Sequence, residues 1–227
     1  MIVRSLQGRK VRQLSLGTSH SAAITEDHHV LTWGYGGDGR LGHGNEYDQL
    51  NPTLVEALEG HLAVQVVCGE LHTGALTADG KVFTWGLGKD GRLVCILGKR
   101  RWKLLMPPQG HFNRESHYIP ERVIALDEYQ MVQIACGGLH TAVLSDSGQV
   151  FTFGLGKDGR LGHGNERDQL APKLIDSLQR FTVTQVLCGG HHTAALSDEG
   201  RIYTWGFDGK WSCILTPSIS LRIVVHR

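Results

Sequence analysis

Short apolar segments separated by turn residues recur along the whole chain. The segments are rich in Val, Leu, Ile, Thr and Ala, and most of them end at a glycine or at an Asp/Gly pair. Short runs of β-branched and small residues bounded by such turns are typical of strands rather than helices. The pattern therefore predicts an all-β protein made of many short strands joined by tight turns.

Two motifs repeat four times in the same order. A histidine motif (LGTSH, CGELH, CGGLH, CGGHH) precedes a glycine motif (TWG, TWG, TFG, TWG), and both series are spaced by 52, 68 and 52 residues. The prolines Pro52, Pro120 and Pro172 keep the last two of these spacings. Markers that share one register identify an internal repeat. Its defining residues are His20, His72, His140 and His192, with Gly34, Gly86, Gly154 and Gly206.

Each copy of the repeat predicts four strands. In the first copy we expect strands near 12–17, 20–25 and 30–34, and a fourth over the sequence PTLVEAL; the later copies follow 52, 120 and 172 residues further on. Turns such as ADGK and DEGR suit a hairpin that needs positive φ. Proline fits an edge strand, where no amide donor is required. Four strands per repeat predict a blade of a β-propeller.

The repeat divides the chain into an array and a tail. Residues 1–206 are predicted to form the partial propeller and residues 207–227 a tail without the repeat. In this division the fourth copy ends after its third strand. The copies lie near 11–58, 63–126, 131–178 and 183–206.

The third copy carries a family resemblance. Its run VQIACGGLHTAVLSDSGQVFTFGLGKDGRLGHGN, residues 132–165, resembles the consensus of the regulator-of-chromosome-condensation repeat family, and the resemblance extends over nearly all of residues 11–206. Members of this family usually close a ring of seven blades, which needs more residues than this chain has. The resemblance thus implies an incomplete ring of about four blades.

The second copy contains an insertion of 16 residues, Val94–Gln109, between GRL and GHFN. In the family's exchange factor for the small GTPase Ran, a protruding element contacts the GTPase, and the sequence KRRWK at 99–103 would suit such a contact. The alternative hypothesis is a translated intron, since Val codons begin with GT and a Gln codon can end in AG. The tail 207–227 fits the same hypothesis, because Gly209-Lys210 can be encoded by GGTAAG.

Composition narrows the classes of partner and compartment. A formal net charge of +1 gives no specific signal for nucleic acid, and no segment predicts a membrane span. Five cysteines and no signal-peptide pattern at the N-terminus favour reduced thiols in the cytoplasm or nucleus.

The histidines recur once per copy, and Cys68, Cys136 and Cys188 recur once in each of the last three copies, so they do not converge on one site. We interpret the histidines as packed residues bonded to nearby backbone and the cysteines as small buried hydrophobes. We therefore expect no catalytic residues, metal or cofactor.

The glycine-rich loops lack the GK[ST] ending of a phosphate loop and are interpreted as turns. Their recurring charges form either a partner-facing strip or a solvated rim. The residues concerned are Arg40, Arg92, Arg160, Asp38, Asp90 and Asp158.

Together these features predict a non-catalytic module for protein–protein interaction. Two alternatives implied by the resemblance remain open: an exchange factor for a Ran-like small GTPase, and a fragment of a large ubiquitin ligase. The family's plant photoreceptor carries the motif GWRHT, whereas the four copies here read TSH, ELH, GLH and GHH, so we expect no photoreception. The open ends of the array also predict self-association.

Overall fold

The computed structural model describes residues 6–88, 116–207 and 212–213. The insertion Val94–Gln109, with Asp90 and Arg92 before it, lies outside the described residues, as does most of the tail. The hypotheses about the origin of both segments therefore stay predictions.

Four antiparallel sheets, which we call blades 1 to 4, follow one another along the chain. Blade 1 contains β1 (Val11–Leu16), β2 (His20–Thr25), β3 (Val30–Gly34) and β4 (Gln49–Leu54). Blade 2 contains β5 (Ala63–Cys68), β6 (His72–Thr77), β7 (Val82–Gly86) and β8 (His117–Arg122). Blade 3 contains β9 (Met131–Cys136), β10 (His140–Ser145), β11 (Val150–Gly154) and β12 (Gln169–Leu174). Blade 4 contains β13 (Val183–Cys188), β14 (His192–Ser197), β15 (Ile202–Phe207) and β16 (Ser212–Cys213).

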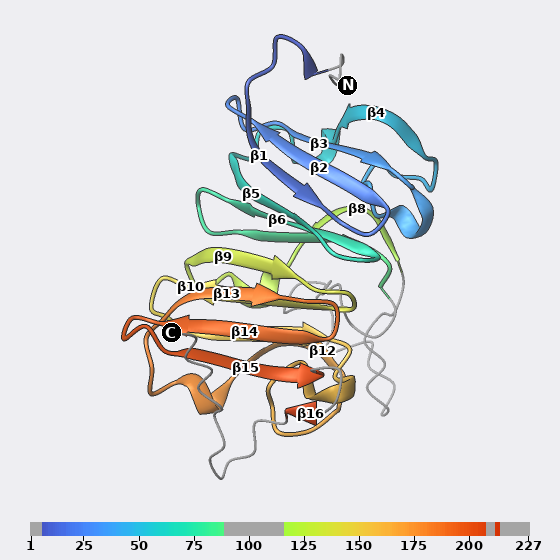
Figure 1. The fold of residues 1–227 in the computed structure, drawn as a ribbon. Coiled ribbons are helices and arrows are strands. Elements are labelled where there is room, and N and C mark those ends of the chain that lie inside the picture. The colour runs from blue at the N-terminus through green and yellow to red at the C-terminus, as the bar shows by residue number, and fades with distance from the viewer. Residues whose placement is uncertain (1–5, 89–115, 208–211, 214–227) are drawn as a thin grey trace, which may run out of the picture.

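The blades stack face to face in chain order (Figure 1). The second strand of each blade packs on the first strand of the next, as β2 does on β5, β6 on β9 and β10 on β13. The first strands also contact one another in sequence, which places β1, β5, β9 and β13 along the inner side of the array. The predicted fold, an incomplete β-propeller of four blades, is confirmed.

The predicted strand positions agree with the structure for the first three strands of a copy and differ for the fourth. The sequence PTLVEAL is not one strand: β4 begins earlier, at Gln49, and a 3₁₀ turn at Glu56–Leu58 follows it. Because β4 is an edge strand that pairs only with β3, Pro52 can lie inside it without breaking a ladder. The turn then directs Leu58 into the core, where 3% of it is exposed.

The fourth copy has a short fourth strand where the sequence suggested none. Strand β15 extends to Phe207, and β16 pairs with it through Gly206–Cys213 and Phe207–Ser212. Blade 4 thus has four strands, but its outer strand is only two residues long and covers little of β15.

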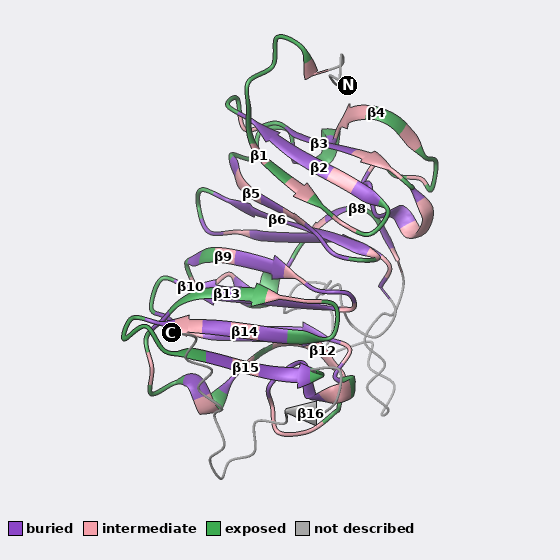
Figure 2. Cartoon of the chain, in the orientation of Figure 1, coloured by how far each residue is buried: buried purple, intermediate pink, exposed green. Residues whose placement is uncertain are grey.

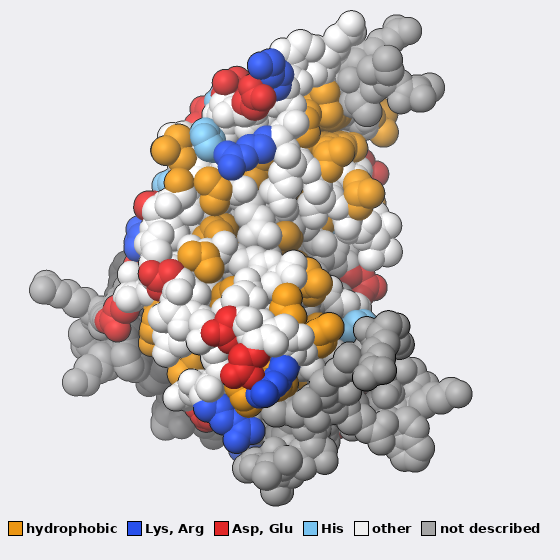
Figure 3. Space-filling model, turned by 60° about the vertical axis from the view of Figure 1, so that its left-hand side comes forward, with side chains coloured by type: hydrophobic (Ala, Val, Ile, Leu, Met, Phe, Trp, Pro, Cys, Tyr) orange, Lys and Arg blue, Asp and Glu red, His pale blue; other side chains and the backbone are white. Residues whose placement is uncertain are grey.

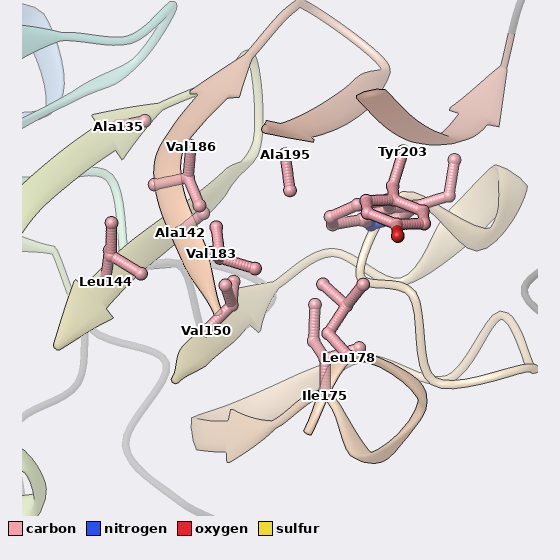
Figure 4. Close-up of a cluster of buried hydrophobic side chains, with 11 residues drawn as sticks. Ala135, Ala142, Leu144, Val150, Ile175, Leu178, Val183, Val186, Ala195 and Tyr203 are labelled. Atoms are coloured by element: carbon pink, nitrogen blue, oxygen red, sulfur yellow. The ribbon is translucent and has the colours of Figure 1, made fainter. Parts of the chain in front are cut away.

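The hydrophobic core is divided into three layers, one between each pair of blades. Buried residues are concentrated in the middle strands, whereas parts of the first and last blades are exposed (Figure 2). Between blades 3 and 4, Leu144 and Val150 of blade 3 pack in one cluster with Val183 and Tyr203 of blade 4 (Figure 4). Each blade therefore depends on its neighbours for burial, as repeat proteins do.

Candidate functional site

The repeated histidine of blades 1, 2 and 3 joins each of these blades to the next one. The ring Nε2 lies within hydrogen-bond distance of the hydroxyl of the threonine that follows the next blade's histidine. The three pairs are His20–Thr73 at 2.8 Å, His72–Thr141 at 3.0 Å and His140–Thr193 at 2.8 Å. The expected partner, nearby backbone, is wrong: the partner is a side chain of the neighbouring blade. His192 is exposed, since no described blade follows it.

Burial keeps His20 and His140 neutral. Desolvation, with a smaller contribution from Arg160, lowers the pKa of His140 to about 3. Desolvation and then Arg40 lower the pKa of His20 to about 4. A neutral ring beside a hydroxyl is a stable buried hydrogen-bond pair, whereas a charged one would be costly.

Arg40 and Arg160 also belong to the contacts between blades. Their exposed fractions are 3% and 1%, so neither forms the exposed strip suggested by the sequence. The Arg40 guanidinium donates to the carbonyl of Glu70 in blade 2 and pairs with Asp38 at 2.9 Å. The matching loop of blade 3 folds onto blade 4 in the same way and buries Arg160 there.

The two acidic partners of these arginines are less buried. The side chains of Asp38 and Asp158 are 36% and 22% exposed, and Asp158 pairs with Arg160 at 2.7 Å. Both aspartates adopt positive φ, 61° and 62°, at the same point of their loops. Each aspartate shapes its loop and balances the positive charge of the buried guanidinium.

The glycines of the second motif allow close backbone contact. All four have φ between 106° and 114°, a region that other residues rarely adopt. At Gly86, for example, an added Cβ would lie 2.6 Å from the carbonyl oxygen of Leu71. The residues are Gly34, Gly86, Gly154 and Gly206.

A groove of about 290 Å³ lies at the inner side of the array. It is lined by the glycine-rich ends of the first strands and by the three repeated cysteines, Cys68, Cys136 and Cys188. Burial raises the pKa of Cys68 and Cys188 to about 12, so both thiols stay protonated at neutral pH. In the described part of the chain, no group of three His, Cys, Asp or Glu residues has the geometry of a metal site.

Some equivalent positions on the exposed surface carry different side chains in different blades. Figure 3 shows acidic, basic and hydrophobic side chains interspersed on one face, without a patch of a single charge. Exposed tyrosines occur on the loop of blade 1 that follows β3, at Tyr35 and Tyr47, which are 51% and 75% exposed. Sequence reasoning missed these two tyrosines because it looked only for residues that the copies share. They could have been found by comparing residues 35–48 with residues 155–168, two loops of nearly identical sequence in which the tyrosines are among the few differences.

The geometry of four similar blades agrees with a comparison against protein families, in which residues 2–214 match the RCC1-like domain. The chain belongs to the RCC1-like domain family. Among curated relatives, it is 34% identical to the ultraviolet-B receptor UVR8 of Arabidopsis thaliana over 91% of this chain and 43% of the receptor. It is 36% identical to the human E3 ubiquitin-protein ligase HERC2 over 90% of this chain and 4% of the ligase.

Solved structures give the same fold. Human WBSCR16 matches with a TM-score of 0.72 and 27% identity over 86% of this chain and 47% of its own. Yeast RCC1 (Prp20) bound to Kap60 matches with a TM-score of 0.73 and 23% identity over 92% of this chain and 48% of its own. This RCC1-like chain thus spans less than half of each of these two structures.

No helix among the described residues of this RCC1-like chain is long and apolar enough to cross a membrane.

Proposed function

We propose that this chain is a non-catalytic protein-interaction module, a part of an RCC1-like propeller whose loops bind another protein. One observation carries the proposal. The repeated polar residues His72 and Arg40 are used inside the seams, by which we mean the contacts between adjacent blades, while some equivalent exposed positions differ, as Tyr47 and Arg167 do. Constant seams build a rigid scaffold, and variable exposed loops on such a scaffold are where binding specificity usually lies.

A ubiquitin-ligase context is the first finer form of this proposal. HERC2 and the human probable E3 ubiquitin-protein ligase HERC3 are 36% and 37% identical to the chain over 90% of its length. In this form the chain is the partner-binding part of a large ligase and acts in the cytoplasm or nucleus. Reduced cysteines are compatible with either compartment.

An exchange factor for a Ran-like small GTPase is the second candidate. The solved structure of Prp20p of Saccharomyces cerevisiae, a protein described as binding Gsp1p and histones, has the same fold and is 23% identical to this chain. The shared fold alone supports this candidate.

A nucleotide-release assay separates the candidates. A Ran-like GTPase is loaded with a fluorescent guanine nucleotide, and release is followed with and without an excess of the chain. For an interaction module we expect no acceleration, together with a saturable complex between the chain and a partner protein in a binding assay. Accelerated release would favour the exchange factor, and no partner in either assay would contradict the proposal.

A further inference from the structure

Two loops of the molecule share one backbone and differ in three side chains. The blade-1 loop (residues 35–48) and the blade-3 loop (residues 155–168) follow the third strands of their blades. In both, the first glycine donates its amide to the last aspartate, Gly36 to Asp48 at 2.8 Å and Gly156 to Asp168 at 2.9 Å. Because the backbone is held in the same way, differences between the loops are differences of surface chemistry.

Two of the three differences remove a cation, and two of them introduce a tyrosine ring. The pairs are Tyr35 against Leu155, Gly37 against Lys157 and Tyr47 against Arg167. Lys157 and Arg167 are both exposed in the blade-3 loop. The blade-1 loop therefore gains two tyrosines and lacks both exposed cations.

Two of these differences depend on each other. A Cβ added at Gly37 would lie 2.5 Å from Cε1 of Tyr35, so a side chain there would displace the ring. With glycine in place, the ring lies over the buried guanidinium of Arg40, whose carbon is 4.8 Å from the ring centroid. This contact orders an exposed tyrosine in the folded loop.

Strand β8 of blade 2 contacts the same loop and adds exposed side chains beside it. An added Cβ at Gly39 would lie 2.6 Å from Cδ1 of Tyr118, and the amide of Gly44 donates to the carbonyl of Tyr118 at 2.8 Å. Tyr118 and Ile119 are 41% and 47% exposed. We call Tyr35, Tyr47, Tyr118 and Ile119 the tyrosine face.

Acidic groups accompany the tyrosine face. The blade-1 loop contains Asp38, Glu46 and Asp48, of which Glu46 and Asp48 are exposed. Its one arginine, Arg40, is buried and paired with Asp38. Exposed rings bordered by carboxylates, without an exposed cation in the loop, attract cationic side chains through the ring faces and through charge.

We propose that the tyrosine face docks a Lys- and Arg-rich segment of a partner protein. The cationic groups lie over the rings and against Glu46 and Asp48, and their aliphatic stems pack on Ile119. Tyrosine is enriched among residues that dominate binding energy at interfaces. The proposal rests on the proposed function, because it names the class of partner for the same interaction module.

The test converts the blade-1 loop into the blade-3 loop with Y35L/G37K/Y47R in the full chain. Blade 3 shows that this loop sequence folds on the same backbone, and an unchanged melting temperature verifies it. The probe is a short, terminally capped fluorescent peptide of alternating Lys and Arg with Gly, measured by anisotropy. We expect the wild type to bind and the variant to bind about tenfold more weakly, from two lost rings and two added cations.

Further variants separate the contributions. Y35L/Y47Q removes the rings without changing charge and is expected to weaken peptide binding severalfold. The matched control K157A/R167A alters the blade-3 loop and is expected not to weaken it. Unchanged peptide binding in Y35L/Y47Q would overturn the proposal, and so would a Glu-containing peptide that binds the wild type as well as the Lys/Arg peptide does. Loss of self-association in Y35L/G37K/Y47R would also overturn it, because the face would then bind a second copy of this chain. A partner protein that binds all variants equally would overturn the tyrosine face and leave the proposed function standing.

Discussion

At the residue scale, the molecule depends on polar pairs that connect one blade to the next. His140 is completely buried and its Nε2 lies 2.8 Å from the Thr193 hydroxyl, which itself donates to the Arg160 carbonyl. Such a chain of hydrogen bonds holds three segments from two blades together. Buried hydrogen bonds of this kind are costly to break, because the remaining partner loses its solvation.

Replacing the seam histidine should destabilise the protein. We expect His140→Ala to lower the free energy of unfolding by about 2 kcal/mol, from the lost hydrogen bond and the cavity. The matched control is His192→Ala, at the same strand position in blade 4, where the ring is exposed; its expected effect is within about 0.5 kcal/mol. Urea unfolding of dilute protein measures both. Equal effects would show that the contact between blades contributes nothing.

The same histidines should make stability depend on pH. The folded-state pKa values of His140 and His20, about 3 and about 4, lie below the ordinary value of 6.5. As the pH falls below 6.5, the unfolded chain therefore binds protons before the folded chain does. Stability is then lost progressively towards these folded values, by about 1.4 kcal/mol per pH unit for each histidine.

Urea midpoints between pH 7 and pH 5 test this dependence. We expect the midpoint of the wild type to fall with pH and that of His140→Gln to fall less steeply, because one titrating group is gone. Parallel slopes for the two proteins would contradict the assignment of a lowered pKa to His140.

Sequence reasoning identified the repeated histidines as structural but expected nearby backbone as their partner, and it placed Arg40 in an exposed strip or rim. The spacing of His72 and Arg40 shows that they recur, whereas their partners, Thr141 and the Glu70 carbonyl, become neighbours only when blades stack. Charge in a glycine-rich loop suggests an exposed residue. Arg40 is buried because its loop folds over the next blade, and no local pattern in the sequence reports that.

At the element scale, the glycine at the end of the first strand of blades 1, 2 and 3 allows each blade to approach the next. A Cβ at Gly69 would lie 2.5 Å from the carbonyl oxygen of Gly137 in the next blade and 2.7 Å from the ring of His72. We expect Gly69→Ala to destabilise the fold by about 1–3 kcal/mol through overpacking between blades 2 and 3. Thermal melting measures the effect.

Gly190→Ala is the control for this prediction. Gly190 lies in the corresponding loop of blade 4, and an added Cβ there would meet nothing within 4 Å. We expect little change in melting temperature for this variant. A loss as large as that of Gly69→Ala would point to backbone conformation, and not to contact between blades, as the reason for glycine.

The strands themselves were largely predictable. Strands β2 and β3 begin and end at the predicted residues, because the histidine and the Trp-Gly motif mark them in every copy. The fourth strand was misplaced, since proline was taken as its start, although an edge strand tolerates Pro52 in its interior. The short β16 was missed because its sequence has none of the repeat's features.

At the scale of the whole molecule, the array has two uncovered ends. Leu14 of blade 1 is 60% exposed, whereas Val66 and Val186, at the same position of blades 2 and 4, are fully buried against a preceding blade. At the other end, Leu187 is 55% exposed and His192 is exposed, with no blade after it among the described residues. Apolar strands left uncovered at the ends of a repeat array favour association with other chains.

The two ends also carry complementary halves of a seam. Within the chain, the side-chain oxygen of Gln13 accepts the amide of Val66, and Gln65 and Gln133 repeat this contact. Gln185 is the next glutamine in this series, and the equivalent donor for its side-chain oxygen is the backbone amide of Leu14 in a second molecule. Ser21 stands in blade 1 where the other blades have the threonine that meets the histidine. We therefore expect head-to-tail association of the 227-residue chain.

Sedimentation velocity over a concentration series tests whether the chain is an open array of four blades with unpaired end faces. We expect the average mass of the wild-type chain to rise with concentration. We expect Leu14→Glu and Leu187→Glu, each of which places a charge on one end face, to reduce this rise without lowering the melting temperature. A wild-type chain that stays monomeric at every concentration and unfolds in one sharp transition would contradict this expectation.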